Sequence, residues 1–345
     1  MENNNNKLKI NNYRKAFKVI KRYMYNPLKV FVMVLFFPIV FFLSFLCSKL
    51  FIFYLFNYKR IGLSKQGFKL NSWDQLIYDL KIKGIRDFAI DKNDINEFEL
   101  KMEGNIISAL KIINKNSNNW VIGLHGFKRN KYIGLRNCNF FYNKGYNILT
   151  FDAYAHGNTY GFKSDFGVTN AKILDFLIKW IKQKYNPSEI GIIGVSMGAS
   201  TSLLFAKEYY IKNKVDWVIV DCPFIEAIIQ IRFFLKKYLK IPWFFMSLGI
   251  KRNFKSYAKS DISTMNMFDG YENFKDLPIL FIHGFKDDFI TYNCSIVMYN
   301  LKIQQEKNKI SDLMIFKNAK HSSCYHKNEN EYKEKIFNFI NNFKR

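Results

Sequence analysis

The sequence is poor in the residues that build disulfide frameworks and metal centres. Its 345 residues include five cysteines, none in a C-x-x-C pair and none at the spacing of a metal site. An odd, scattered set of cysteines is typical of buried free thiols rather than of disulfides. We therefore expect neither a disulfide-stabilised fold nor a metal or organic cofactor. The cysteines are Cys47, Cys138, Cys222, Cys294 and Cys324.

Acidic residues are also scarce. The chain has 28 Asp and Glu against 53 Lys and Arg, which gives a formal charge of +25. Such a charge can indicate a nucleic-acid or anionic-membrane partner. Here the basic residues are spread along the whole chain, without an RNA- or DNA-binding motif, among abundant Asn, Ile, Phe and Tyr. This composition is typical of an AT-rich coding sequence. We expect no nucleic-acid partner, and attraction to a membrane surface stays open.

One long segment near the N-terminus lacks charge altogether. No charged residue occurs in the 19 residues from Val30 to Ser48, and apolar residues continue to Phe56. At about 1.5 Å per residue such a helix spans roughly the 30 Å core of a bilayer. It is too long for the apolar region of a signal peptide, and no small-x-small cleavage site follows it. A buried helix of a soluble domain is the other alternative. We expect residues 28–56 to be a membrane anchor.

The flanking charges predict the orientation of this anchor. Residues 1–29 carry eight Lys and Arg, whereas residues 49–69 carry five. The positive-inside rule then places a basic tail in the cytoplasm and the main domain outside the cell, on a single-pass protein of the cell membrane. We divide the chain into residues 1–60, the tail and anchor, and residues 61–345, the main folded domain.

After the anchor, short β-rich runs alternate with amphipathic helical patterns, which predicts a mostly parallel, doubly wound α/β sheet. The segments 192–195 and 217–220 are wholly apolar, as strands covered on both faces are. The expected strands are 106–113, 120–125, 147–152, 189–195, 215–221, 279–283 and 312–316. The expected helices are 132–143, 171–185, 199–212, 295–306 and 331–343.

Residues 224–276 interrupt this alternation. The segment lies between two expected strands and is far longer than a crossover requires. Aromatic residues such as Phe233, Trp243 and Phe244 are interleaved in it with basic residues such as Lys236 and Arg252. An ordinary pair of core helices would have a similar pattern. We interpret the segment as a helical cap inserted over the active site.

The strongest local signal is Gly194-Val195-Ser196-Met197-Gly198. It follows an expected strand and opens an expected helix, the context in which G-x-S-x-G forms the nucleophile elbow of α/β-hydrolases. The glycines permit a turn in which neighbouring segments come too close for a Cβ. The turn projects the serine hydroxyl away from the sheet and puts the next N–H at a helix N-terminus. Ser196 is the predicted nucleophile.

A serine hydroxyl needs a base within hydrogen-bond reach. In this fold the chain order is serine, acid, histidine, which excludes His125, His156 and His283. His321 follows the last expected strand directly, and His326 lies five residues further on. We predict that His321 is the base. His326 is the alternative; if it is not the base, we expect it to be a solvated residue at the end of a helix.

The acid should lie on a loop at the carboxyl end of a strand that precedes the base. Asp287 and Asp288 follow the strand that ends at His283-Gly284. Asp221, at the end of the preceding strand, is also allowed by the topology. Spacing alone leaves these three candidates open.

An oxyanion needs two preorganised N–H donors. One is the backbone of Met197, directly after the nucleophile. The other should come from the loop after the strand 120–125, where Gly126 permits a turn and the Phe127 N–H can point into the site. The alternative for His125-Gly126 is a simple turn that ends a strand.

Taken together, these motifs resemble the bacterial α/β-hydrolases of the esterase, acylglycerol-lipase and serine-aminopeptidase-like group. The resemblance covers roughly residues 80–345 and includes members with one N-terminal membrane segment. Its landmarks are HGF (125–127), D-x-x-x-H-G-x-T-x-G (152–161), GVSMG (194–198), DCPF (221–224), HGFKDDFI (283–290) and AKH (319–321). Relatives that read H-G-x-x-D favour Asp287 as the acid. Ala153-Tyr154, Thr159 and Thr291 depart from the group's pattern, so the substrate assignment has no support from these motifs.

The expected function is therefore hydrolysis of a carboxylic ester through an acyl-serine intermediate. The expected catalytic residues are Ser196, Asp287 and His321, with Phe127 and Met197 as backbone donors. The expected substrate is a small acyl ester or a lipid near the membrane. A peptidase or amidase on the same triad is the alternative within enzymes. A catalytically silent membrane scaffold is the alternative outside them.

Overall fold

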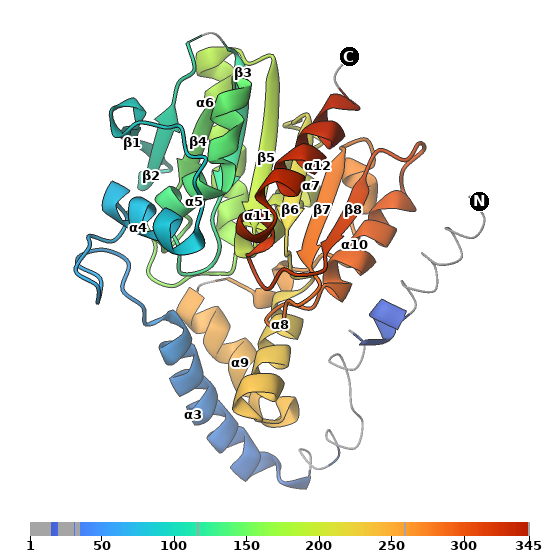
Figure 1. The fold of residues 1–345 in the computed structure, drawn as a ribbon. Helices are drawn as coiled ribbons and strands as arrows, with labels where there is room; N and C mark the ends of the chain where they lie inside the picture. The colour runs from blue at the N-terminus through green and yellow to red at the C-terminus, as the bar shows by residue number, and fades with distance from the viewer. Residues whose placement is uncertain (1–14, 20–30, 32–34, 116, 259, 344–345) are drawn as a thin grey trace.

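The computed structural model describes residues 15–19, 31, 35–115, 117–258 and 260–343. Its centre is an eight-stranded sheet of order β1-β2-β4-β3-β5-β6-β7-β8 (Figure 1). Strands β3 to β8 run parallel to one another, whereas β2 pairs antiparallel with both β1 and β4. The strands are β1 (Asn96–Met102), β2 (Asn105–Ile112), β3 (Asn119–Leu124), β4 (Asn147–Phe151), β5 (Glu189–Val195), β6 (Trp217–Asp221), β7 (Ile279–Gly284) and β8 (Asp312–Phe316).

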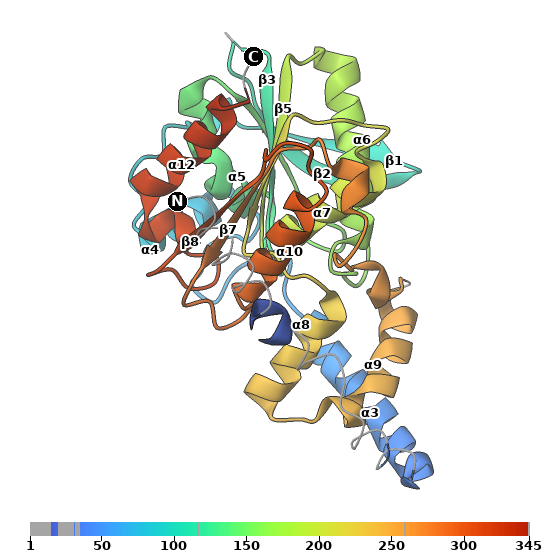
Figure 2. The ribbon, with the colours of Figure 1, turned by 90° about the vertical axis from the view of Figure 1, so that its right-hand side faces the viewer.

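Helices cover both faces of the sheet. Figure 2 shows α4, α5 and α12 on one side and α6, α7 and α10 on the other. Every residue of β4, β6 and β7 is buried, because strands between two helical layers have no solvated face. The helices are α4 (Trp73–Lys83), α5 (Lys131–Cys138), α6 (Val168–Tyr185), α7 (Met197–Tyr209), α10 (Asn293–Ile303), α11 (Cys324–Lys327) and α12 (Glu329–Asn341).

The predicted parallel sheet is confirmed, and all seven predicted strands are present within two residues of their expected limits. Strand β1 was not predicted from the sequence. Phe98, Leu100 and Met102 alternate there with charged residues, a pattern typical of a half-exposed strand. A two-residue turn at Glu103-Gly104, both with positive φ, joins β1 to β2.

The segment between β6 and β7 forms the expected helical insertion. It contains α8 (Ala227–Phe234), the π-helical turn η3 (Leu235–Leu239) and α9 (Trp243–Ala258). Both helices lie beyond the carboxyl ends of the parallel strands, together with the N-terminal helix α3 (Phe37–Phe56) (Figures 1 and 2). The insertion therefore covers the edge of the sheet at which α/β folds bind their ligands.

Helix α3 is the main described part of the predicted anchor 28–56, of which residues 28–30 and 32–34 lie outside the described ones. It is long and apolar enough to cross a membrane. Pro38 falls in its first turn, where the missing N–H breaks no helical hydrogen bond. Phe51, Ile52 and Phe56 are buried in the same core as α9. A division of the chain at residue 60 stays a prediction.

Candidate active site

Ser196 stands at a strained turn between β5 and α7. Its φ of 57° and ψ of −118° lie in a region that residues with a side chain seldom adopt. A Cβ on Gly194 would lie 2.4 Å from the Gly198 carbonyl oxygen, and one on Gly198 would lie 2.6 Å from that of Leu124. Both positions therefore require glycine. The turn has the geometry of a nucleophile elbow, with the serine at the carboxyl end of the central strand.

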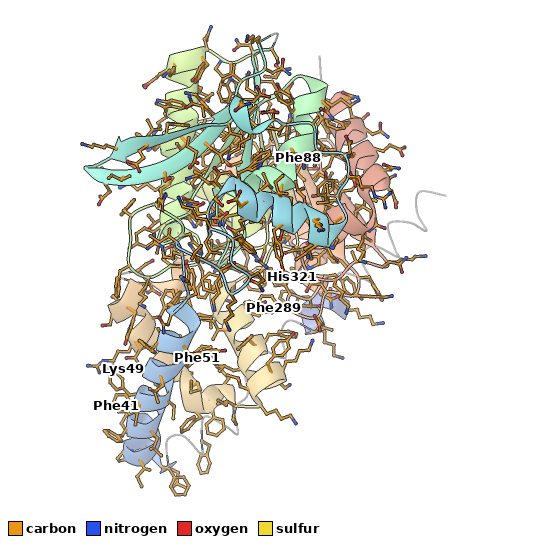
Figure 3. All side chains as sticks on the ribbon, turned by 60° about the vertical axis from the view of Figure 1, so that its left-hand side comes forward. Phe41, Lys49, Phe51, Phe88, Phe289 and His321 are labelled. Carbon is orange, nitrogen blue, oxygen red and sulfur yellow. The ribbon has the colours of Figure 1, made fainter. Side chains whose placement is uncertain are left out.

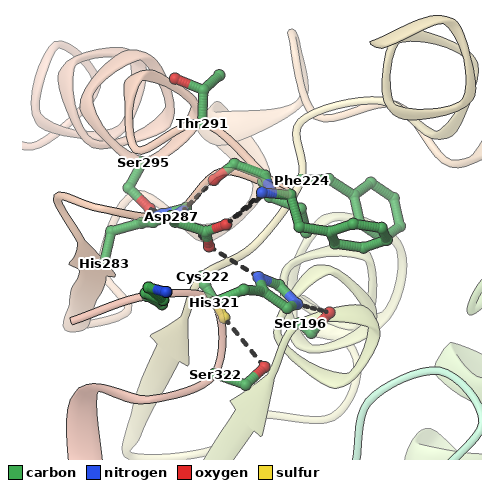
Figure 4. Close-up of polar contacts among 12 residues, drawn as sticks. Ser196, Cys222, Phe224, His283, Asp287, Thr291, Ser295, His321 and Ser322 are labelled. Atoms are coloured by element: carbon green, nitrogen blue, oxygen red, sulfur yellow. Dashed lines mark hydrogen bonds and ion pairs between the residues drawn. The ribbon is translucent and has the colours of Figure 1, made fainter. Parts of the chain in front are cut away.

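His321, in the loop after β8, links Ser196 to Asp287. Its Nε2 lies 3.0 Å from the Ser196 Oγ, and its Nδ1 lies 2.7 Å from the Asp287 Oδ2 (Figure 4). With the ring proton assigned to Nδ1, the imidazole donates to the carboxylate and leaves Nε2 free to accept the serine proton. The three residues come from loops that follow three different strands, β5, β7 and β8, which meet at one edge of the sheet.

Asp287 is held as a buried carboxylate. Its Oδ1 accepts the backbone N–H groups of Phe289 and Ile290, at 2.9 and 2.8 Å. Burial opposes its ionisation, but hydrogen bonds from His283 and His321 outweigh that effect and hold the pKa of Asp287 well below its usual range. A charged Asp287 can stabilise a protonated His321 and orient its ring.

The other candidates for base and acid have other partners. His326, on α11, lies near Lys83 and Arg136, and burial together with these positive charges lowers its pKa to about 4. The Asp288 side chain is exposed, and its Oδ2 lies 3.8 Å from the Nζ of Lys237 in the insertion. The buried Asp221 accepts a hydrogen bond from Tyr332 instead.

The loop after β3 approaches the nucleophile. A Cβ on Gly126 would lie 3.3 Å from the Ser196 Cβ, so only glycine leaves this approach unhindered. Phe127 and Met197 line the same cavity as Ser196. Neither of their backbone N–H groups has an acceptor among the described residues. The two groups are thus free to receive an oxyanion, and this role stays a prediction.

Two buried histidines that the sequence analysis excluded as bases hold this loop in place. The His156 Nε2 accepts the N–H of Lys128 at 3.0 Å, and its Nδ1 donates to the Tyr154 carbonyl. The His125 Nε2 accepts the N–H of Ala153, and its Nδ1 donates to the Gly126 carbonyl. Burial lowers the pKa of both rings, which keeps each neutral and able to accept at Nε2.

His283 is a third histidine with a role that the sequence analysis did not assign. It is fully buried at the end of β7, and its Nε2 lies 3.2 Å from the Asp287 Oδ2 and 3.0 Å from the Ile290 carbonyl oxygen. Its Nδ1 lies 2.7 Å from the Ser295 hydroxyl (Figure 4). The H-G-x-x-D spacing was the available signal, since four residues around a tight turn bring the two side chains together.

An apolar cavity opens beside Ser196. Among the described residues that line it, Ser196 and Gln230 alone are polar and none is charged. Its walls come from α3, from the loop after β3, from α8 and from the loop after β7. The apolar lining consists of Phe51, Leu55, Phe127, Phe166, Met197, Phe224, Ala227, Ile231, Phe234, Phe289 and Ile290.

One group of potential metal ligands falls on this same site. Side-chain ligand atoms of Cys222, Asp287 and His321 lie within 4.8 Å of one another. Burial raises the pKa of the Cys222 thiol well above its usual value, so the sulfur stays protonated and is a poor ligand. The other two residues are already hydrogen-bonded to each other. The arrangement suits acid–base chemistry better than metal binding.

The sheet, the elbow and the helical insertion define an α/β-hydrolase, and the class of protein is a serine hydrolase. The sequence pattern of the prolyl oligopeptidase family matches residues 170–344, which is half of the chain. The chain belongs to this family.

Two curated proteins and one solved structure are similar to this chain. The chain is 29% identical over 233 residues to an uncharacterized protein, YqkD, of Bacillus subtilis, covering 65% of this chain and 72% of the relative. It is 26% identical over 168 residues to the lysophosphatidylserine lipase ABHD12 of Danio rerio, covering 47% of this chain and 41% of that relative. The esterase Pf2001 of Pyrococcus furiosus has the same fold, with a TM-score of 0.61 and 22% identity over 83% of this chain and 98% of that structure.

Proposed function

We propose that the chain is a serine esterase that hydrolyses a carboxylic ester with an apolar acyl chain at a membrane. The observation that carries the proposal is the hydrogen-bonded series from Asp287 through His321 to Ser196, which ends at the uncharged cavity. The likeness to a lysophosphatidylserine lipase and to an esterase supports the same substrate class.

Acylation starts at Ser196. Its Oγ attacks the ester carbonyl carbon while its proton passes to the His321 Nε2, 3.0 Å away. The carbonyl oxygen becomes an oxyanion, for which the free N–H groups of Phe127 and Met197 are the available donors. The charged Asp287 stabilises the imidazolium. When the tetrahedral intermediate collapses, His321 gives the proton to the leaving alcohol and the acyl group stays on Ser196.

Deacylation repeats these steps with water. His321, neutral again, removes a proton from a water molecule that attacks the acyl carbon. The second tetrahedral intermediate expels Ser196, whose Oγ takes the proton back from the Nε2. The products are the carboxylic acid and the regenerated enzyme. No step requires a metal or an organic cofactor.

A peptidase on the same residues is the second candidate, and membership of the prolyl oligopeptidase family favours it. A peptidase that recognises a free amino terminus needs a carboxylate near the nucleophile. Glu226, the acid of the insertion nearest to β6, lines a separate depression with Arg232 and Lys251. The uncharged lining of the Ser196 cavity therefore favours an acyl chain over a charged peptide end.

Membrane attachment through α3 is part of the proposal. Its outward side exposes large apolar residues, among them Phe42, Leu46 and Leu50, at 67%, 46% and 61%. An apolar surface of this kind costs free energy in water and is stabilised in lipid. We further propose that the hydrolase domain lies outside the cell, because residues 1–29 carry more Lys and Arg than residues 49–69.

A comparison of esters with amides tests the proposal. The full chain, in detergent, is assayed with p-nitrophenyl esters and with matched aminoacyl p-nitroanilides. We expect kcat/KM to be higher for the esters and to rise from acetyl to octanoyl. A preference for the amides selects the peptidase. Absence of turnover together with absence of labelling by a fluorophosphonate selects the silent scaffold.

A further inference from the structure

We propose that the last two turns of α3 form a wall of the acyl-binding subsite, so that the membrane helix itself selects the acyl chain. The inference rests on the proposed esterase function and assigns its substrate class: esters of fatty acids that lie in a bilayer, with the acyl chain against Phe51 and Leu55. Both residues line the cavity that contains Ser196.

A series of aromatic rings connects α3 to the catalytic histidine. The ring of Phe51 lies 6.2 Å from that of Phe234 on α8, and Phe234 lies 6.2 Å from Phe289. Phe289 in turn lies 5.0 Å from the imidazole of His321. Figure 3 shows Phe51 on α3 on the side toward Phe289 and His321. The path along which an acyl chain can extend from Ser196 is therefore apolar as far as the helix.

Contacts with α9 hold this wall in place. The Asn253 side-chain amide donates to the Ser48 hydroxyl and to the Phe45 carbonyl, at 2.7 and 3.0 Å. A Cβ on Gly249 would lie 2.2 Å from the Ser48 Oγ, so the two helices approach as closely as glycine allows. Small residues and interhelical hydrogen bonds of this type join helices in lipid as well as in water. Phe51, one turn further along α3, is therefore a fixed part of the cavity.

The apolar lining of the Ser196 cavity favours an alkyl chain over a peptide. Of its two polar side chains, Ser196 is the proposed nucleophile, and the Gln230 amide already donates to the Phe289 carbonyl at 2.6 Å. A peptide in this cavity would leave its backbone N–H and C=O groups without partners, which costs free energy. An alkyl chain has no such groups, and each buried methylene is favourable.

The opposite side of α3 indicates that the acyl chain of the substrate enters from the bilayer. Phe42, Leu46, Leu50 and Phe53 follow one another at helical spacing and are all exposed, whereas Phe51 is buried. One helix thus presents one apolar side outward and another to the cavity. A lipid whose headgroup ester reaches Ser196 can keep its acyl chain beside α3 and avoid transfer through water.

The matched pair Phe51→Ala and Phe53→Ala tests the inference, because the same change is made two residues apart on opposite sides of one helix. The full chain is assayed in mixed micelles with acetyl, butyryl, octanoyl and palmitoyl esters. We expect Phe51→Ala to lower the octanoyl-to-acetyl ratio of kcat/KM about tenfold, since a few methylene contacts are lost. Phe53→Ala should leave this ratio within about twofold of wild type. Equal ratios in the two variants overturn the inference.

A second variant keeps the test decisive if Phe51→Ala loses its fold. Leu55→Trp adds volume to the cavity wall and should shift the preference toward shorter acyl chains. An unchanged chain-length profile for Leu55→Trp also overturns the inference. Failure of the proposed esterase function gives a different result from failure of this inference. In that case the wild-type chain neither hydrolyses the acetyl ester nor reacts with a fluorophosphonate.

Discussion

His283 shares one oxygen of Asp287 with His321: the His283 Nε2 lies 3.2 Å and the His321 Nδ1 2.7 Å from the same Oδ2. His283 is fully buried and is also hydrogen-bonded to the Ser295 hydroxyl and to the Ile290 carbonyl. These hydrogen bonds fix the orientation of the His283 ring. The ring in turn fixes the direction from which the Asp287 carboxylate approaches His321. In the proposed triad His283 would act through Asp287, as a residue that positions the acid.

Asp287→Asn should lower kcat about 10⁴-fold while the fold is kept, because an amide cannot stabilise the protonated imidazole and can favour the wrong tautomer. Asp288→Asn is the matched control, one residue along the same loop with an exposed side chain. It should stay within a few-fold of wild type in p-nitrophenyl ester assays. If Asp288→Asn were the inactive variant, the assignment of the acid would be wrong by one position.

Ser196→Ala should abolish both fluorophosphonate labelling and ester turnover. Residues of such a triad act as a unit, so the loss of turnover can reach about a millionfold. Ser188→Ala, at an exposed position before β5, serves as the control and should label as wild type does. Undiminished labelling of the Ser196→Ala chain would falsify the nucleophile assignment.

His321→Ala should be as damaging to kcat as the serine change, whereas His326→Ala should remain within a few-fold of wild type. The reason is position, since His321 lies 3.0 Å from the Ser196 Oγ and His326 lies beside Lys83 and Arg136. Steady-state kinetics with one p-nitrophenyl ester compare the two variants. If His326→Ala lost most of its kcat while His321→Ala stayed active, His326 would be the base instead of His321.

His326 should make the protein less stable in mild acid. Burial and nearby positive charges lower its pKa from 6.5 to about 4, so the folded chain binds fewer protons than the unfolded chain between these values. This contribution to stability is present above pH 6.5 and is lost as the pH falls through about 4. Because the ring is partly exposed, we expect a loss of roughly 1 kcal/mol, after a discount for solvent screening.

Melting temperatures measured from pH 7.5 to pH 4 check this prediction. The difference between wild type and His326→Gln should change steadily across the interval, with the variant losing less stability toward acid. Parallel curves for the two proteins would show that His326 is not linked to folding.

The full chain should remain with membranes after washing with carbonate or high salt and should be released by detergent, because α3 exposes a long apolar side. The double change Leu46→Glu and Leu50→Glu places two charges on that side and should shift the chain toward the soluble fraction. An equal distribution of both proteins would argue against insertion of α3. Protease added to intact cells tests the orientation: protection of the hydrolase domain reverses it and leaves the anchor untouched.

Sequence alone determined the parts of this protein that depend on local patterns. Seven of the eight strands could be predicted because apolar runs and turn residues alternate along the chain. The tight turn at Ser196 could be predicted because it needs two glycines at fixed spacing. The prediction of His321 as the base rested on its place directly after the last strand. The missed strand β1 was also readable, through the alternation of Phe98, Leu100 and Met102.

Only the tertiary structure decided which distant segments meet at the site. No local pattern brings Phe51 of the N-terminal helix to Phe234 of the insertion, 183 positions away in the numbering, because that contact depends on how α3 packs against α9. The same holds for His156, whose ring holds the Lys128 N–H. Periodicity tells which side of a helix is apolar, but the identity of the partner on that side is set by the packing of the whole chain.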